Sequence, residues 1–106
     1  MENLQDKPSS LGKLERCYTR LHYFKSKMDS YLYEPSTKAL FETKEYLKEK
    51  IRLLAEANQN LLNYLKATGE LLPEQYRLVN NHIKETFDLE FDVMEYTLKT
   101  RKTVQL

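Results

Sequence analysis

The sequence predicts an all-α protein, an elongated up-down-up bundle of three long helices joined by short loops. Apolar residues recur along most of the chain at alternating steps of three and four, which is the spacing of one helix face. Helix breakers are scarce, because 106 residues include only two glycines and three prolines. Few breakers mean few turns, so the helices must be long. A rod of this kind buries a thin core, so pairing of two copies into a larger bundle remains open.

The first helix is expected to begin at Ser9 or Ser10, either of which can cap it, and to run to about Tyr33. We expect a flexible N-terminal arm over residues 1–9, one three-helix domain over residues 10–102, and a flexible tail over residues 103–106. The apolar stripe of this helix repeats at heptad steps and consists of Leu14, Cys17, Leu21, Phe24, Met28 and Tyr31.

The second helix carries the strongest pattern. Pro35 disfavours helical geometry at the residue before it, so it should end the first helix, and Ser36 or Thr37 should cap the second. This helix is expected to run to about Ala67, with Gly69 as its stop signal. Its stripe consists of Leu40, Leu47, Ile51, Leu54, Leu61 and Leu65, with Lys44 and Asn58 in the two gaps.

The third helix is expected from about Pro73, which suits a first turn, to about Lys99 or beyond. Two neighbouring stripes cover more than half of its circumference, which predicts contacts with several neighbours or half of a dimer seam. The first stripe is Tyr76, Val79, Ile83, Phe87, Phe91, Met94 and Leu98. The second stripe, which we consider a candidate partner-binding surface, is Leu78, His82, Leu89, Val93 and Tyr96.

Charge favours contact between the first and third helices. Residues 10–28 carry five basic side chains and one acidic side chain, a net of 5 − 1 = +4. Residues 74–96 carry two basic and six acidic side chains, a net of 2 − 6 = −4. Exposed ion pairs contribute at most ~1 kcal/mol each, so these charges select a topology more than they stabilise it.

Composition limits the classes of function. The net charge is +1, and this balance argues against non-specific polyanion binding. A single cysteine, Cys17, cannot form an internal disulfide, and a buried thiol fits a reducing, cytoplasmic location. The N-terminal residues MENLQDKP resemble no signal peptide. No apolar run approaches the ~18 residues of a membrane span, so we expect no membrane partner.

Motifs for chemistry are missing from the sequence. Cys17 and His22 are five residues apart and do not share a helix face, so they are not expected to act as nucleophile and base. His82 and Glu85 are three apart, but the chain holds no Glu-x-x-His motif of the kind that di-metal bundles require. We therefore expect no enzyme activity, no metal or cofactor, and no small-molecule substrate. His82 is expected at the edge of the core and His22 at the surface.

Asn58 is the sharpest single feature, because it stands where the leucine stripe calls for an apolar residue. A buried amide costs stability unless it is paired, and two facing amides can fix the register of a dimer. Asn58 could form such a contact between two copies, act as a polar switch in the core, or reach water at the edge of the stripe. The sequence leaves these alternatives open.

The predicted function is non-catalytic recognition of another protein, as an adaptor, chaperone or inhibitor, with homodimerisation expected. A minor face of the second helix offers apolar and tyrosine side chains at helical spacing, as helix-docking surfaces do. Its candidate partner-binding residues are Tyr46, Leu53, Ala57, Asn58 and Tyr64, with Asn60 beside them. One alternative is a nucleic-acid-binding regulatory protein that uses the basic face Lys13, Arg16, Arg20, Tyr23 and Lys27. Another alternative is a structural, self-assembling subunit.

Overall fold

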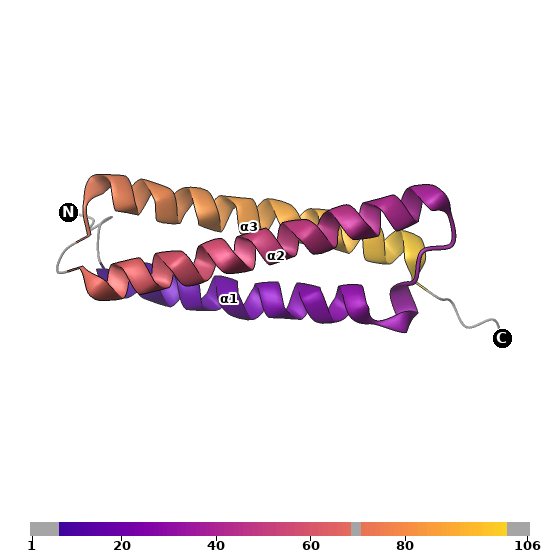
Figure 1. Cartoon of the computed structure of the whole chain (residues 1–106), viewed down its shortest axis with the longest axis horizontal. Helices are drawn as coiled ribbons and strands as arrows, with labels where there is room; N and C mark the ends of the chain where they lie inside the picture. Colours follow the sequence, from indigo (N-terminus) through magenta and orange to yellow (C-terminus); the bar gives the residue numbers. More distant parts are fainter. Residues whose placement is uncertain (1–6, 69–70, 102–106) are drawn as a thin grey trace.

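The computed structural model describes residues 7–68 and 71–101. Three helices, α1 (Lys7–Asp29), α2 (Lys38–Ala67) and α3 (Pro73–Thr100), run side by side along one axis (Figure 1), and a short 3-10 helix η1 (Tyr31–Tyr33) follows α1. The bundle measures 56 × 24 × 17 Å. The expected all-α, elongated, up-down-up architecture is confirmed, with no strand among the described residues.

Helix α1 begins earlier and ends earlier than the sequence suggested. Residues 7–9 are already helical, with Pro8 in the first turn, where its missing N–H costs nothing. The rest of the expected arm, residues 1–6, lies outside the described residues. At the other end, the extended backbone of Ser30 breaks the helix, and its side chain accepts a hydrogen bond from the Leu32 N–H at 3.2 Å. Tyr31 therefore sits in η1 and is 74% exposed, so its assignment to the apolar stripe was wrong.

The ends of α2 and α3 follow the expected capping chemistry. The hydroxyl of Thr37 accepts the Leu40 N–H at 3.1 Å at the start of α2. The proposed stop, Gly69, lies outside the described residues, and α2 ends at Ala67. Pro73 opens α3, and the Gln75 side chain accepts the Leu72 N–H at 2.7 Å. The expected tail at residues 103–106 is also outside the described residues.

The core consists of two apolar clusters arranged along the rod. One cluster is built around Leu14, Leu62, Leu65, Leu71 and Val79. The other contains Leu21, Phe24, Met28, Leu47, Ile51, Leu54, Leu89, Val93 and Tyr96. The buried face of α2 drifts as the helix proceeds, so Leu62 is buried and Leu61 is only partly buried. The buried residues of α2 take two steps of four in succession, from Leu54 to Asn58 to Leu62, and this shifts the face as expected for a helix with 3.6 residues per turn.

The two stripes of α3 proved to have opposite roles. Most of the second stripe is core, because His82, Leu89, Val93 and Tyr96 are at most 3% exposed. These four residues cannot serve as the partner-binding surface that we expected, and only Leu78 of that stripe is exposed. Most of the first stripe lies outside. Apart from Thr97, the buried residues of α3 follow heptad steps, and they are Gln75, Val79, His82, Thr86, Leu89, Val93, Tyr96 and Thr100.

Contacts between the helices include the expected pairing of opposite charges. Arg20 on α1 forms a 2.9 Å salt bridge with Glu90 on α3. At the η1 end of the rod, the buried hydroxyl of Tyr96 donates a 2.8 Å hydrogen bond to the carbonyl of Tyr33. Burial raises the pKa of Tyr96, so this hydroxyl remains a donor at neutral pH. Tyr96 thereby anchors the α1–α2 connection to α3.

Replacing Tyr96 with phenylalanine should test this anchor. Tyr96→Phe keeps the ring and removes the hydrogen bond to Tyr33, so the free energy of unfolding should fall by about 1 kcal/mol. Urea unfolding followed by far-ultraviolet circular dichroism measures the change. The matched control is Tyr46→Phe, whose side chain is exposed and should change stability little. Equal unfolding midpoints for both variants would show that the Tyr96 hydroxyl does not anchor η1.

Candidate functional site

A buried polar layer separates the two apolar clusters. Asn58 on α2 is completely buried. Its Nδ2 donates to the carbonyl of Leu14 on α1 at 3.1 Å, and its Oδ1 lies 2.7 Å from Nε2 of His82 on α3. Because Oδ1 can only accept, the His82 Nε2 must carry the proton. One amide therefore links all three helices.

This placement decides among the alternatives for Asn58. The expectation that it reaches water at the stripe edge was wrong, because the side chain has no exposed surface. A contact between the Asn58 amides of two copies does not fit either, since both ends of the amide are occupied within the chain. Asn58 is therefore a polar core residue and leaves the set of candidate partner-binding residues.

His82 and Cys17 lie in or beside this layer. Burial lowers the pKa of His82 below its ordinary value, and the carboxylate of Glu85 opposes this shift in part. Burial raises the pKa of the Cys17 thiol, which the neighbouring Thr86 hydroxyl and the charges of Arg20 and Arg16 only partly oppose. At neutral pH, His82 is uncharged and Cys17 is a protonated, buried thiol, which makes it a weak nucleophile.

The most exposed apolar surface lies on α3, on residues of the first stripe. We call Phe87, Phe91, Met94 and Leu98 the outer strip. Their steps of four, three and four place them on one face, and their exposed fractions are 51%, 72%, 53% and 75%. The signal was visible in the sequence, but periodicity could not show that this stripe faces outward.

A row of basic side chains on α1 borders the outer strip. This basic row consists of Lys13, Arg16, Arg20 and Lys27, with Tyr23 beside it, and is the face proposed above for nucleic acid. Lys13, Arg16 and Arg20 share a groove of about 390 Å³ with Ile83 and Phe87 of α3. The guanidinium of Arg20 also lies 5.9 Å from the centre of the Phe87 ring. Basic and apolar side chains thus form one continuous surface over α1 and α3.

An acid row lies on the opposite side of the strip. It consists of Asp88, Asp92 and Glu95, all exposed on α3. Asp92 and Glu95 line a groove shared with Leu40 and Tyr46 of α2, so this row faces the α2 side of α3. Asp88 and Glu95 have exposed lysines of their own helix at 3.4 and 3.8 Å, and such pairs contribute little.

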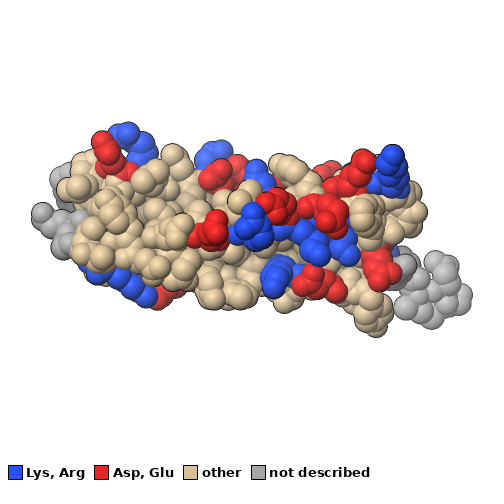
Figure 2. Space-filling view, in the orientation of Figure 1, with Lys and Arg blue, Asp and Glu red and all other residues tan. Residues whose placement is uncertain are grey.

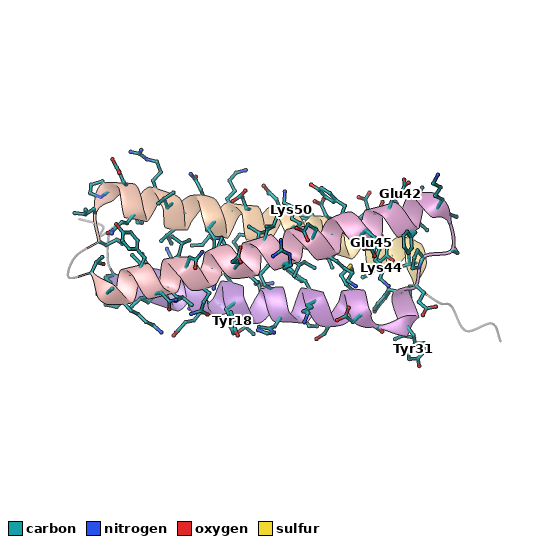
Figure 3. The ribbon with its side chains drawn as sticks, viewed as in Figure 1. Tyr18, Tyr31, Glu42, Lys44, Glu45 and Lys50 are labelled. Carbon is teal, nitrogen blue, oxygen red and sulfur yellow. The ribbon has the colours of Figure 1, made fainter. Side chains whose placement is uncertain are left out.

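The minor face of α2 is exposed as expected, but it is less continuous than the outer strip. Tyr46, Leu53 and Tyr64 are 48–58% exposed, while Ala57 is half-buried. Figure 2 shows charged side chains crowding the N-terminal half of α2, whereas its C-terminal half, toward the left, is largely uncharged. The charged half includes Glu42, Lys44, Glu45 and Lys50 (Figure 3).

A groove between α1 and α2 has a volume of about 530 Å³. Its floor is apolar and includes Leu21, Met28 and Ile51, while Lys25, Glu45, Lys48, Glu49 and Arg52 form a charged rim of mixed sign. The exposed His22 also borders it. The rim contains both signs without a dominant charge, so it indicates no particular ligand.

Two general features of the surface are also clear. No helix in residues 7–68 and 71–101 combines the length and apolar character that crossing a bilayer requires. Within the same residues, no three His, Cys, Asp or Glu side chains converge where a metal ion could sit.

In comparisons with known proteins, the chain matches no protein-family model, no curated protein and no solved structure.

Removing the Asn58 amide should destabilise the bundle. Asn58→Leu leaves the His82 Nε2–H buried without a partner, so the free energy of unfolding should fall by about 1–3 kcal/mol. Replacing both partners, as in Asn58→Leu/His82→Leu, removes the unpaired donor as well. The double variant should therefore lose less stability than the sum of the two single variants, as measured by urea unfolding. Strictly additive losses would contradict a direct Asn58–His82 contact.

The lowered pKa of His82 predicts that stability falls in mild acid. Below an ordinary histidine pKa of about 6.5, the unfolded chain takes up a proton that the folded chain resists. The stabilising contribution of His82 is therefore complete above that pH and is lost as the pH falls toward the folded-state pKa. The slope should reach up to about 1.4 kcal/mol per pH unit.

Urea unfolding at a series of pH values measures this dependence. His82→Gln should flatten the part between about pH 6.5 and pH 5, whereas His22→Gln, which changes an exposed histidine, should leave it intact. A His82→Gln protein with the wild-type slope would contradict the assignment.

Proposed function

We propose that this protein is a non-catalytic protein–protein interaction module, of adaptor, chaperone or inhibitor type, whose docking surface is the outer strip with the basic row beside it. The observation that supports this proposal is that the four large apolar side chains of the outer strip lie on one face of α3 and are each more than half exposed. At these fractions they present on the order of 500 Å² of apolar surface. The largest contiguous apolar patch on a typical monomer measures about 300–600 Å² and is often functional.

The mechanism is docking of a partner helix along α3. A helix that carries apolar residues at three- and four-residue steps can lay them against the outer strip. Phe91 and Leu98, the most exposed members, are the natural anchors. Because the strip lies on a continuous helix of 28 residues, little of its backbone must be ordered on binding. The basic row would orient the partner by attracting acidic side chains.

The nucleic-acid alternative has weaker support. Lys13, Arg16 and Arg20 of the basic row are exposed and Lys27 is half-buried. Tyr23, at 58% exposure, could stack on a base. However, Arg20 is paired with Glu90 of α3 at 2.9 Å. The acid row, which also lies on α3, repels phosphate. An apolar strip beside the row has no role in binding a polyanion backbone.

Polar substitutions in the outer strip should abolish partner capture. Phe91→Ser/Leu98→Ser removes both anchors and should reduce capture of a specific host protein at least tenfold. The measurement is affinity capture from the native host with quantitative mass spectrometry. The control is Tyr46→Ser/Tyr64→Ser, which changes two exposed apolar residues of α2 and should retain the same protein.

Both double variants alter exposed positions, so each should keep its helical circular dichroism. Loss of capture in the α2 control together with retention in the α3 variant would move the docking surface to α2. Equal capture by both variants and the wild type would contradict a docking role for either face.

A further inference from the structure

The outer strip has opposite charges on its two sides. Crossing the surface from α1 over α3 toward α2, one meets the basic row, then the apolar strip, then the acid row. On the α1 side, the basic row carries four positive charges, and Arg20 of this row is paired with Glu90 of α3. On the α2 side, the acid row carries three negative charges, and Lys84 and Lys99 lie 3.4 and 3.8 Å from Asp88 and Glu95, so the net charge of this side is 2 − 3 = −1. A surface with this order of charges can be complementary to itself.

The two rows also match in height along the rod. Helices α1 and α3 run in the same direction, and the Arg20–Glu90 salt bridge shows that these residues lie at the same level. Arg16 lies about one turn before Arg20, and Lys27 lies about two turns after it. On the far side of the strip, Asp88 falls near the level of Arg16 and Arg20, and Glu95 falls near the level of Lys27.

We propose that the occupant of the outer strip is a second copy of this chain, related by a two-fold axis parallel to the helices. This inference rests on the proposed function, because it assigns the partner of the same surface. Such an axis brings strip against strip and exchanges the two sides. The basic row of each copy then faces the acid row of the other at the same height. The contact is closed, because each copy contributes the same patch.

The charges disfavour the other arrangements. A two-fold axis perpendicular to the helices does not exchange the two sides of the strip. The basic row of one copy would then face the basic row of the other, and the two acid rows would also face each other. A foreign helix with acidic flanks would satisfy the basic row but would lie close to the acid row. A foreign helix could pair with both sides only if it placed acidic side chains opposite the basic row of α1 and basic side chains opposite the acid row of α3. The second copy meets that requirement by symmetry.

The apolar area is suited to an interface of moderate strength. The strip alone presents on the order of 500 Å² per copy, against about 800 Å² per partner in a standard interface. The flanking rows supply the remainder as a polar rim. The rim sets orientation more than affinity, so the strip must provide most of the attraction.

Charge reversal tests this arrangement on purified protein. Sedimentation equilibrium at low salt should show a dimer for the wild type. Reversing the acid row in Asp88→Lys/Glu95→Lys, or the basic row in Arg16→Glu/Lys27→Glu, should raise the dimer Kd at least tenfold. Mixing the two reversed proteins should restore a one-to-one dimer, because every facing pair is again of opposite sign. Raised salt should weaken the wild-type dimer. If rows of the same charge faced each other instead, raised salt would strengthen the dimer.

The direction of the two copies is tested by cross-linking. In the proposed dimer, the Leu98→Cys side chains of both copies lie at the same level, so a bis-maleimide reagent of about 10 Å should join them. In an antiparallel dimer centred on the strip, Leu98 would lie opposite Phe87 and about 16 Å along the axis from its copy. The wild type, with only its buried Cys17, is the control for background linkage.

The outcomes separate this inference from the proposed function. A wild type that stays monomeric at low salt, while Phe91→Ser/Leu98→Ser loses a captured host protein, would overturn the dimer and leave the docking function standing. A monomeric wild type with no strip-dependent partner would overturn both. A dimer that neither charge reversal weakens, or that Phe91→Ser/Leu98→Ser leaves intact, would overturn the assigned interface.

Discussion

The buried amide of Asn58 is a polar contact that constrains how the three helices can be arranged. Apolar clusters lie on both sides of it, and apolar side chains can exchange neighbours at modest cost when a helix slides or rotates. The amide cannot, because it bonds Leu14 on α1 and His82 on α3 at the same time. A shift of either helix would leave a buried polar group unpaired, which costs more than the hydrogen bond contributes.

This constraint explains why α3 places its largest apolar side chains on the outside. Rotating α3 to bury Phe87 and Phe91 would carry His82 and Thr86 away from the core. His82 would then lose its bond to Asn58, and the amide would remain buried with nothing in its place. The Thr86 hydroxyl donates a 3.0 Å hydrogen bond to the carbonyl of His82, so this buried hydroxyl has a partner in its present position. The same rotation would also expose Leu89, Val93 and Tyr96 of the core. The outer strip is therefore exposed because the polar layer and the apolar core both require the other face of α3 to be buried.

The sequence predicted the architecture better than the orientation of the helices. The stripe from Leu14 to Met28, the cap at Thr37 and the start at Pro73 were all confirmed. These features are local, because they depend on residues within one or two turns. The break at Ser30 was missed, although serine favours such ends, because the apolar pattern continues through it to Tyr31.

The candidate site depends on contacts that local patterns do not contain. Periodicity shows that residues share a face but not what that face meets. Asn58 finds its partners 44 and 24 residues away in sequence, so its burial could not be read from α2 alone. One signal in α3 was available. The face from Gln75 to Thr100 keeps strict heptad steps, whereas the stripe containing Phe87 and Phe91 does not. Because several residues of the Gln75–Thr100 face are polar, a search for apolar stripes did not reveal its regular spacing.

The polar core and the outer strip together support the proposed association of two copies. Asn58, His82, Thr86 and Gln75 occupy buried positions that apolar residues would otherwise fill. Covering on the order of 500 Å² of apolar surface on each copy, about 1,000 Å² in total, corresponds to roughly 25 kcal/mol of transfer free energy before any cost. Association itself costs about 4–15 kcal/mol, and ordering of side chains and desolvation of polar groups at the interface cost more. The net gain is therefore much smaller than the transfer free energy. At that balance, a few rim charges suffice to decide which partner and which orientation prevail.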